Sequence, residues 1–470
     1  MTQTAQDGRR RLVIGSADVV GRECARVLSS ISIVLLCSLG CATARAPGSS
    51  AESASPPSNV DSVAIAFSAR GDSTGLGDAI AAGCRSWKDS AQCIEGALST
   101  AARDGYVKIA MGALNRLGAT NPDIRRTGHV YAHAIGIAAG SSGADIEKTF
   151  TQCSESYQSG CYHGVIQAWF ASLDSVSAAD ANALCAPFRT RESDRWIRFQ
   201  CVHGMGHGLT MLYDHDLPKG LAGCDLLSEW WDRHSCYSGA FMENIVNVTA
   251  PHHPASALSH HDGKGGDHKA MESMDHDMTE MHHGEARPFK AVDPADPLYP
   301  CSALPDRYLS ACYEMQTSVM LYNNKGDIAG AAKGCDTAPV DMRPICYASL
   351  GRDVSSYSLQ NHAEAVRMCS LGTPKYRPWC YYGLVKNFID LEARPQDGIA
   401  MCRDVPDAAG KTLCYDAVGE QVAILAPDVE KRRLICETAE AGFVEVCSYG
   451  ARLGTQAPAE LVAIWDAARK

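Results

Sequence analysis

The cysteines of this 470-residue chain constrain its fold more than any other feature. Three of the 21 cysteines lie in the first 41 residues, at Cys24, Cys37 and Cys41, which leaves 18 for the rest. These 18 form nine successive pairs: 84/93, 153/161, 185/201, 224/236, 301/312, 335/346, 369/380, 402/414 and 436/447. Regular pairs are typical of disulfides in an exported protein. A zinc site would instead be indicated by CxxC motifs, and the sequence contains none. We predict one local disulfide per pair, although 18 cysteines allow many other pairings.

The second cysteine of each pair marks an internal repeat. It recurs at 312, 346, 380, 414 and 447, with a step of roughly 34 residues each time. The interval from Cys93 to Cys161 is twice this step, which predicts a unit near Thr127 that has no cysteines. The interval from Cys236 to Cys312 contains one repeat plus an insertion. We therefore count about ten units.

Each unit has the pattern of two helices. In one unit the polar and apolar residues of 361–369 have helical spacing. Pro374 and Pro378 then interrupt the helix, and 380–389 has the pattern of a second amphipathic helix. The cysteines thus fall at the end of the first helix and the start of the second. Closing such a loop stabilises the fold by roughly 3 kcal/mol in the chain-entropy model. The prediction is an all-α solenoid of about ten two-helix repeats of roughly 34 residues, with one disulfide per repeat.

A period of roughly 34 residues with paired helices resembles the α-solenoid families, above all the tetratricopeptide and Sel1-like repeats. The resemblance covers about residues 80 to 450 and is architectural, because the Trp-Leu-Gly-Tyr pattern is absent and the disulfide is foreign to those repeats. It implies a curved right-handed superhelix with a concave face. It implies no particular chemistry.

Histidines gather on one face of three consecutive second helices. The positions two and six residues after the second cysteine point to the same side of a helix. With Thr127 placed at the cysteine position, these positions are occupied by His129, His133, His163, His203 and His207. We call these five residues the histidine ladder. Additional ligands, or partners of the ligands, are expected among Glu95, Gln167, Met242 and Glu243.

Three interpretations of the ladder stay open. Neighbouring helices lie roughly 8–10 Å apart, and closer at glycines such as Gly164 and Gly206, so imidazoles from several helices can share a transition-metal ion. The positive end of the helix dipole favours the neutral ring that ligation requires. The other interpretations are a purely structural polar ladder and a site for a small anion.

The ladder also allows an enzyme. Histidine pairs on repeat helices resemble those of HEAT-repeat di-iron hydroxylases, but glycine or valine follows His129, His163 and His203 where that family has glutamate, so no ligand role carries over. A GxSxG motif is absent and the cysteines are paired. What remains is a metalloenzyme with a mono- or dinuclear histidine centre, in which Glu95 or Glu243 acts as acid or base.

An insertion rich in histidine and methionine interrupts the repeat at 249–299. Its potential ligands are His252, His253, His260, His261, His268, Met271, Met274, His276, Met278, Met281, His282 and His283. Its Gly and Pro content predicts a mobile surface loop. Imidazole together with thioether favours copper over iron or zinc. SMDHDM and EMHHG resemble the Met/His-rich segments of bacterial periplasmic copper-resistance proteins, which implies copper capture or transfer; a hydrophilic insertion that binds metal fortuitously is the alternative.

The first 41 residues have the features of an export signal. Basic residues precede the apolar run 31–40, which is too short for a permanent membrane helix. Ser38-Leu39-Gly40-Cys41 resembles a bacterial lipobox, which implies a lipid anchor at Cys41 on the periplasmic face of a membrane; plain secretion is the alternative. The Ser-, Pro- and Ala-rich segment 42–75 is predicted as a disordered tether.

The rest of the chain divides into N-terminal repeats at 76–248, which carry the ladder, and C-terminal repeats with a capping helix at 300–470. At the ladder positions the C-terminal units have Arg352, Tyr382, Lys386, Asp416 and Glu420, which form either a protein-binding concave face or a solvated surface. A net charge of −11 without a basic stripe argues against nucleic acid. The prediction is an exported metal-handling protein, with an interaction scaffold as a further alternative.

Overall fold

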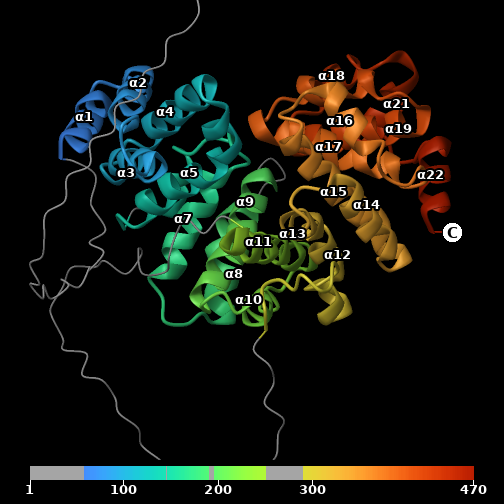
Figure 1. Cartoon of the computed structure of the whole chain (residues 1–470), viewed down its shortest axis with the longest axis horizontal. Helices are drawn as coiled ribbons and strands as arrows, with labels where there is room; N and C mark the ends of the chain where they lie inside the picture. Colours follow the sequence, from blue (N-terminus) through green and yellow to red (C-terminus); the bar gives the residue numbers. More distant parts are fainter. Residues whose placement is uncertain (1–57, 144, 190–194, 250–288, 470) are drawn as a thin grey trace, which may run out of the picture. The chain divides into compact units, whose positions relative to one another are not determined.

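The computed structural model describes residues 58–143, 145–189, 195–249 and 289–469, and over these ranges the fold is all-α (Figure 1). They contain 22 α-helices with short 3-10 turns and no strand, as predicted. A helix long and apolar enough to cross a membrane is not found among them. The export signal, the anchor at Cys41 and the ligands of the insertion between 250 and 288 lie outside the described residues.

The helices up to the insertion are α1 (Ser58–Ala69), α2 (Ser73–Cys84), α3 (Ser90–Arg103), α4 (Val107–Thr120), α5 (Pro122–Gly140), α6 (Ile146–Phe150), α7 (Gly160–Ala171), α8 (Ala178–Leu184), α9 (Arg195–Leu212), α10 (Leu217–Cys224) and α11 (Trp230–Thr249). Those after it are α12 (Leu309–Tyr313), α13 (Gln316–Asn323), α14 (Ile328–Thr337), α15 (Arg343–Tyr357), α16 (His362–Cys369), α17 (Arg377–Glu392), α18 (Pro395–Asp404), α19 (Ala408–Leu425), α20 (Val429–Cys436), α21 (Val444–Gly450) and α22 (Ala459–Arg469).

Aspartate or asparagine caps fix where the first helices of several units begin. Asp327, Asn361 and Asp428 each accept a hydrogen bond from the backbone N–H three residues further on, at the starts of α14, α16 and α20. Such a cap contributes about 1 kcal/mol. Arg394 occupies the corresponding position before α18, where Pro395 starts the helix instead. The caps therefore recur with the period of the cysteines.

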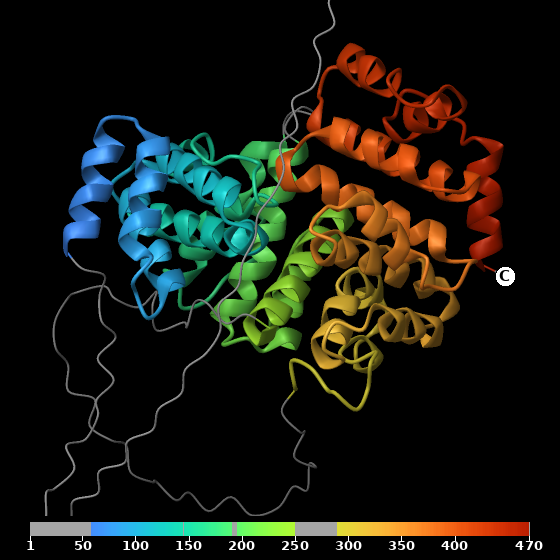
Figure 2. The same ribbon diagram turned by 45° about the horizontal axis from the view of Figure 1, so that its top comes forward.

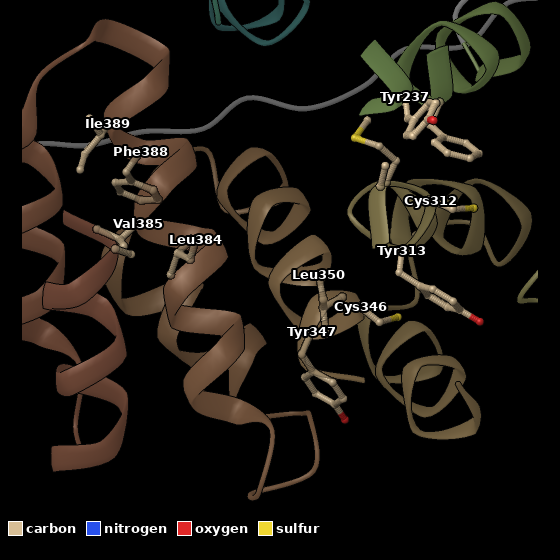
Figure 3. Close-up of a cluster of buried hydrophobic side chains, with 14 of the residues drawn as sticks. Tyr237, Cys312, Tyr313, Cys346, Tyr347, Leu350, Leu384, Val385, Phe388 and Ile389 are labelled. Atoms are coloured by element: carbon tan, nitrogen blue, oxygen red, sulfur yellow. The ribbon is translucent and has the colours of Figure 1, made fainter. Parts of the chain in front are cut away.

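All nine predicted disulfides are present. Cys369, for example, ends α16 and bonds to Cys380 in the first turn of α17. The residue after the second cysteine is a fully buried tyrosine in four successive units, at Tyr313, Tyr347, Tyr381 and Tyr415. Figure 3 shows two of these tyrosines beside their cysteines. These buried tyrosines thus follow the same period as the cysteines.

The second helices of successive units pack on one another, α5 on α7, α7 on α9 and α9 on α11, and likewise α15, α17, α19 and α21 (Figures 1 and 2). In every second pair, such as α15 and α17, the two helix backbones approach each other very closely. A Cβ atom on Gly383 of α17 would lie 1.8 Å from the Ala348 carbonyl oxygen, and one on Gly351 of α15 would lie 1.9 Å from the Cys380 carbonyl oxygen. Facing glycines therefore bring the two backbones into contact.

These glycine contacts correct the register predicted for the unit without cysteines. Gly239 and Gly383 each abut the carbonyl group of the residue two positions after a cysteine, which is His203 or Ala348. In the pair α5 and α7, Gly164 abuts the carbonyl group of His133 in the same way. Tyr131, not Thr127, therefore stands at the cysteine position. The error is about one helical turn, so the predicted helix face is unchanged.

The ends of the repeats differ in how well they follow the prediction. The segment predicted as a capping helix is helical, as α22, and buries Leu461 and Ala468. The predicted tether 42–75 is too long, because α1 and the start of α2 are helical. The prediction missed that α1 packs through Ala64, which is fully buried, and Phe67, which lies against the N-terminal core.

Candidate metal centre

The structure brings all five ladder histidines together from α5, α7 and α9. Within α5, the ring centroids of His129 and His133 are 4.5 Å apart. The His163 ring on α7 lies 5.7 and 5.3 Å from these two rings. It also lies 4.8 Å from His203 and 5.2 Å from His207 of α9, and the His207 ring in turn lies 5.0 Å from His133. His163 is therefore the central ring of the group.

Glycines allow the three helices to approach this closely. A Cβ atom on Gly164 of α7 would lie 2.1 Å from the His133 carbonyl oxygen of α5, and one on Gly239 of α11 would lie 1.9 Å from the His203 carbonyl oxygen. Between α7 and α9 the contact is looser, since Gly204 faces the Ile166 side chain at 3.1 Å. Backbone contact thus sets the spacing of α5 and α7 and of α9 and α11, whereas side chains separate α7 from α9.

Every ladder ring has one nitrogen bonded to a protein oxygen. The bonds are His129 Nδ1 to Tyr157 O at 2.8 Å, His133 Nδ1 to Gln167 Oε1 at 2.7 Å, His163 Nε2 to Gln200 Oε1 at 2.9 Å, His207 Nδ1 to Glu243 Oε2 at 2.9 Å, and His203 to the backbone of Ser235. These oxygens only accept, so in each neutral ring the bonded nitrogen carries the proton and the other nitrogen keeps a lone pair. Metal-binding histidines are typically held in this way.

Three of the remaining nitrogens are buried without a hydrogen-bond partner. They are His163 Nδ1, His203 Nδ1 and His207 Nε2. A buried polar atom left unsatisfied costs about 1–3 kcal/mol, so three in one place need an explanation. One ring nitrogen from each of these three residues lies within 4.8 Å of the other two, and the same holds for His129, His133 and His163. Either group therefore has the geometry to hold a metal ion, and the two groups share His163.

Burial keeps three of the rings neutral. Desolvation lowers the pKa of His129 to about 4 despite its bond to Tyr157. Desolvation, reinforced by the neighbouring histidines, lowers the pKa values of His163 and His203 well below the ordinary range. At neutral pH these imidazoles are therefore available as ligands.

Glu243 of α11 supplies negative charge beside the ladder. Burial would raise its pKa, but hydrogen bonds from His207 and His215 outweigh this effect and lower it to about 2. Its Oε2 atom also accepts from Gln167 Nε2 at 3.0 Å. Since Gln167 Oε1 bonds His133, the carboxylate is connected to histidines of α5 and α9 alike.

Four other residues had been predicted near the site. Gln167 and Glu243 are in it, as partners of the histidines. Met242 is half-buried against the apolar core. Glu95 lies on α3, where its charge adds to the effect of burial in raising the pKa of Tyr131.

Two residues of the site were not predicted from the sequence. They are Gln200, which holds His163, and His215, whose Nε2 lies 3.3 Å from Glu243 Oε1. Both fall outside the positions two and six residues after the second cysteine, where the ladder was found. Gln200 lies one residue before the second cysteine of its pair, Cys201, so a comparison of that position would have found it.

At the ladder positions of the C-terminal units the structure has a charged network instead of histidines. Lys386 Nζ lies 3.1 Å from Glu420 Oε2, and the Tyr382 hydroxyl donates to the same oxygen at 2.5 Å. Asp416 is only 4% exposed. The prediction of a solvated surface is therefore wrong for Asp416.

Comparison of the chain with protein-family models, with curated proteins and with solved structures found no match. The resemblances to tetratricopeptide and Sel1-like repeats and to copper-resistance proteins therefore stay predictions. The assignment of the ladder depends on its own geometry.

Proposed function

We propose that this is an exported metal-binding protein that functions in metal handling or tolerance, with its metal ion at His163, His203 and His207. The observation that carries the proposal is the set of three partnerless buried nitrogens, one on each of these rings. A purely structural ladder would pair them, because an unpaired buried nitrogen costs stability. An ion bound by all three removes that cost. It also draws the rings together, because nitrogens on one tetrahedral ion are about 3.3 Å apart.

Copper is the proposed metal, with iron and zinc as alternatives. The support is the composition of the insertion, whose imidazole and thioether groups suit copper. The insertion follows α11, the helix that carries Glu243, so metal captured by it would be released next to the ladder. The nine disulfides fit an oxidising extracytoplasmic compartment. The lipid anchor at Cys41 and the periplasmic location belong to the same proposal.

The proposed architecture is a solenoid of about ten two-helix units, related in shape to tetratricopeptide and Sel1-like arrays. The stacking of consecutive second helices and the recurring caps, disulfides and tyrosines support it. A protein partner on the concave face is part of this proposal.

A metalloenzyme is the second candidate function. Three protein nitrogens leave a coordination position open, as in catalytic zinc sites, whereas structural sites are closed by four protein ligands. Glu243 would then position His207 and balance the charge of the ion.

The test is metal content by mass spectrometry on protein made in an oxidising compartment. The variants are His163→Asn/His203→Asn/His207→Asn, a deletion of residues 251–284, and the control His234→Asn, whose ring pairs with Glu314 rather than with a ladder residue. We expect the deletion and the control to keep a stoichiometric ion and the triple variant to lose it. If the triple variant keeps the same metal content as the control, the ladder is not a metal centre and the scaffold alternative takes its place.

A further inference from the structure

The two histidines of α5 have a feature that the other three lack. His129 Nε2 and His133 Nε2 face each other at 3.1 Å. Both rings are bonded through Nδ1 to an oxygen that only accepts, so in the neutral rings both Nε2 atoms carry lone pairs. Two lone pairs at this distance repel each other. A cation that both nitrogens bind turns the repulsion into attraction.

The separation fits one ion. Imidazole nitrogens bind first-row divalent ions at about 2.0–2.1 Å, which places two neighbouring ligands about 2.8 Å apart at a right angle and about 3.4 Å apart at the tetrahedral angle. The 3.1 Å between the Nε2 atoms lies inside this range. Two histidines four residues apart on one helix are a known metal chelate, since both point to the same side.

This ion is separate from the one at His163, His203 and His207. His163 contacts both groups of histidines, but Gln200 holds its Nε2, so only Nδ1 is available as a ligand. That nitrogen binds the first ion and is not available to the second. A second ion therefore has His129 and His133 as its protein nitrogens, and exogenous oxygen or nitrogen donors complete its coordination. His129 is half-buried whereas the other four ladder residues are buried, so this ion lies on the side nearer to solvent.

We propose that the ladder is a dinuclear centre, in which His129 and His133 chelate a second divalent transition-metal ion next to the ion of the other three histidines. The proposal rests on the proposed function. Because the second ion has two protein nitrogens and the first has three, the two ions bind with different affinities, and the α5 ion exchanges more readily.

The test counts ions per full chain after loading with Cu²⁺ or Zn²⁺ and dialysis against a weak competing chelator. The variants are His129→Asn/His133→Asn, His203→Asn/His207→Asn and the control His234→Asn. The insertion is the same in all of them, so its metal cancels in the differences. We expect each ladder variant to hold one ion fewer than the control.

The outcomes separate the two proposals. If only the α9 variant loses an ion, the centre is mononuclear: the second ion is disproved and the proposed function stands. If neither variant loses an ion, both proposals fail. Should the α5 variant not fold, anomalous scattering from crystals of the loaded wild-type chain decides the question, since two peaks at the ladder support the proposal and a single peak overturns it.

Discussion

Glu243 is a buried carboxylate with three donors around it, from His207, His215 and Gln167. A carboxylate in this position does two things for a bound ion. It fixes the tautomer of His207 so that Nε2 is the ligand, and it offsets the positive charge that the ion brings into a dry site.

We expect Glu243→Gln to weaken metal binding at the ladder by about 10- to 100-fold, because the amide is neutral and can accept fewer hydrogen bonds. A titration against a competing chelator measures the change. Glu314→Gln is the matched control, since Glu314 accepts from His234 rather than from a ladder histidine. An unchanged affinity in Glu243→Gln would show that the carboxylate only fills space.

Asp416 gives a prediction that does not depend on metal. Burial, with help from Glu420 and against the opposing effect of Lys386, raises its pKa from 3.8 to about 8. Between these two values the unfolded chain has lost the proton and the folded chain has kept it. The contribution of Asp416 to stability is therefore fully present below pH 3.8 and is lost as the pH rises toward 8.

Asp416→Asn removes this loss, because the amide stays neutral at every pH. We expect the variant to unfold a few degrees higher than the wild type at pH 8, with the difference disappearing near pH 4. Thermal unfolding followed by circular dichroism over this pH range tests it, with the exposed Asp466→Asn as control. A difference that is constant with pH would contradict the assigned pKa.

Residue-level prediction from the sequence succeeded where helical periodicity decides the answer. His129 and His133, like His203 and His207, share a helix face because they are four residues apart, and the repeat predicts that these faces lie on neighbouring helices. Gln200 and His215 could not be found in this way, because contact with a histidine or carboxylate of another helix depends on packing. His215 lies after the end of α9 with φ of 61°, outside any helical period.

The facing glycines are the feature of the helices that sets the spacing of the units. Gly383 and Gly351 bring α15 and α17 into backbone contact, and the same arrangement recurs in the pair α9 and α11, where it brings the ladder helix against the helix of Glu243. Backbone contact cannot be relaxed by a change of rotamer.

We expect Gly383→Ala to destabilise the protein by about 3 kcal/mol or more, since the new methyl group would lie 1.8 Å from the Ala348 carbonyl oxygen and the two helices must move apart. Chemical denaturation measures the loss. Gly442→Ala is the control, because nothing lies within 4 Å of its Cβ position, and it should be neutral. A similar stability for both variants would mean that α15 and α17 tolerate separation.

At this scale the cysteines predicted the helix pairs well, since a disulfide ties each loop to a known place in the repeat. Where no cysteine is present, the prediction was less accurate. In the unit of α5, Tyr131 and not Thr127 stands at the cysteine position, and only the contact of Gly164 with the His133 carbonyl group shows it. The helix α1 was missed because no cysteine lies in it.

One segment connects the ladder to the C-terminal units. Tyr157, Gln158 and Ser159 have φ values of 57°, 53° and 63°, a backbone region that costs about 1–3 kcal/mol per residue outside glycine. The Tyr157 carbonyl oxygen accepts from His129, and its N–H donates to the Leu391 carbonyl oxygen at the end of α17 with an N···O distance of 3.1 Å. The Gln158 amide also donates to Asn387 of α17.

Because one peptide segment holds both His129 and α17, binding at the ladder should stabilise the contact with α17. An ion that fixes the His129 ring fixes the Tyr157 carbonyl group with it, and an ion present at 100 times its dissociation constant stabilises the folded chain by about 2.7 kcal/mol.

We expect removal of metal by a chelator to increase hydrogen exchange at 157–160 and at 387–392, and to leave α20 and α22 unchanged. The increase at 387–392 should be absent in His129→Asn, which has lost the connection in either state. Equal exchange at 387–392 with and without metal in the wild type would show that the ladder and the C-terminal units behave independently.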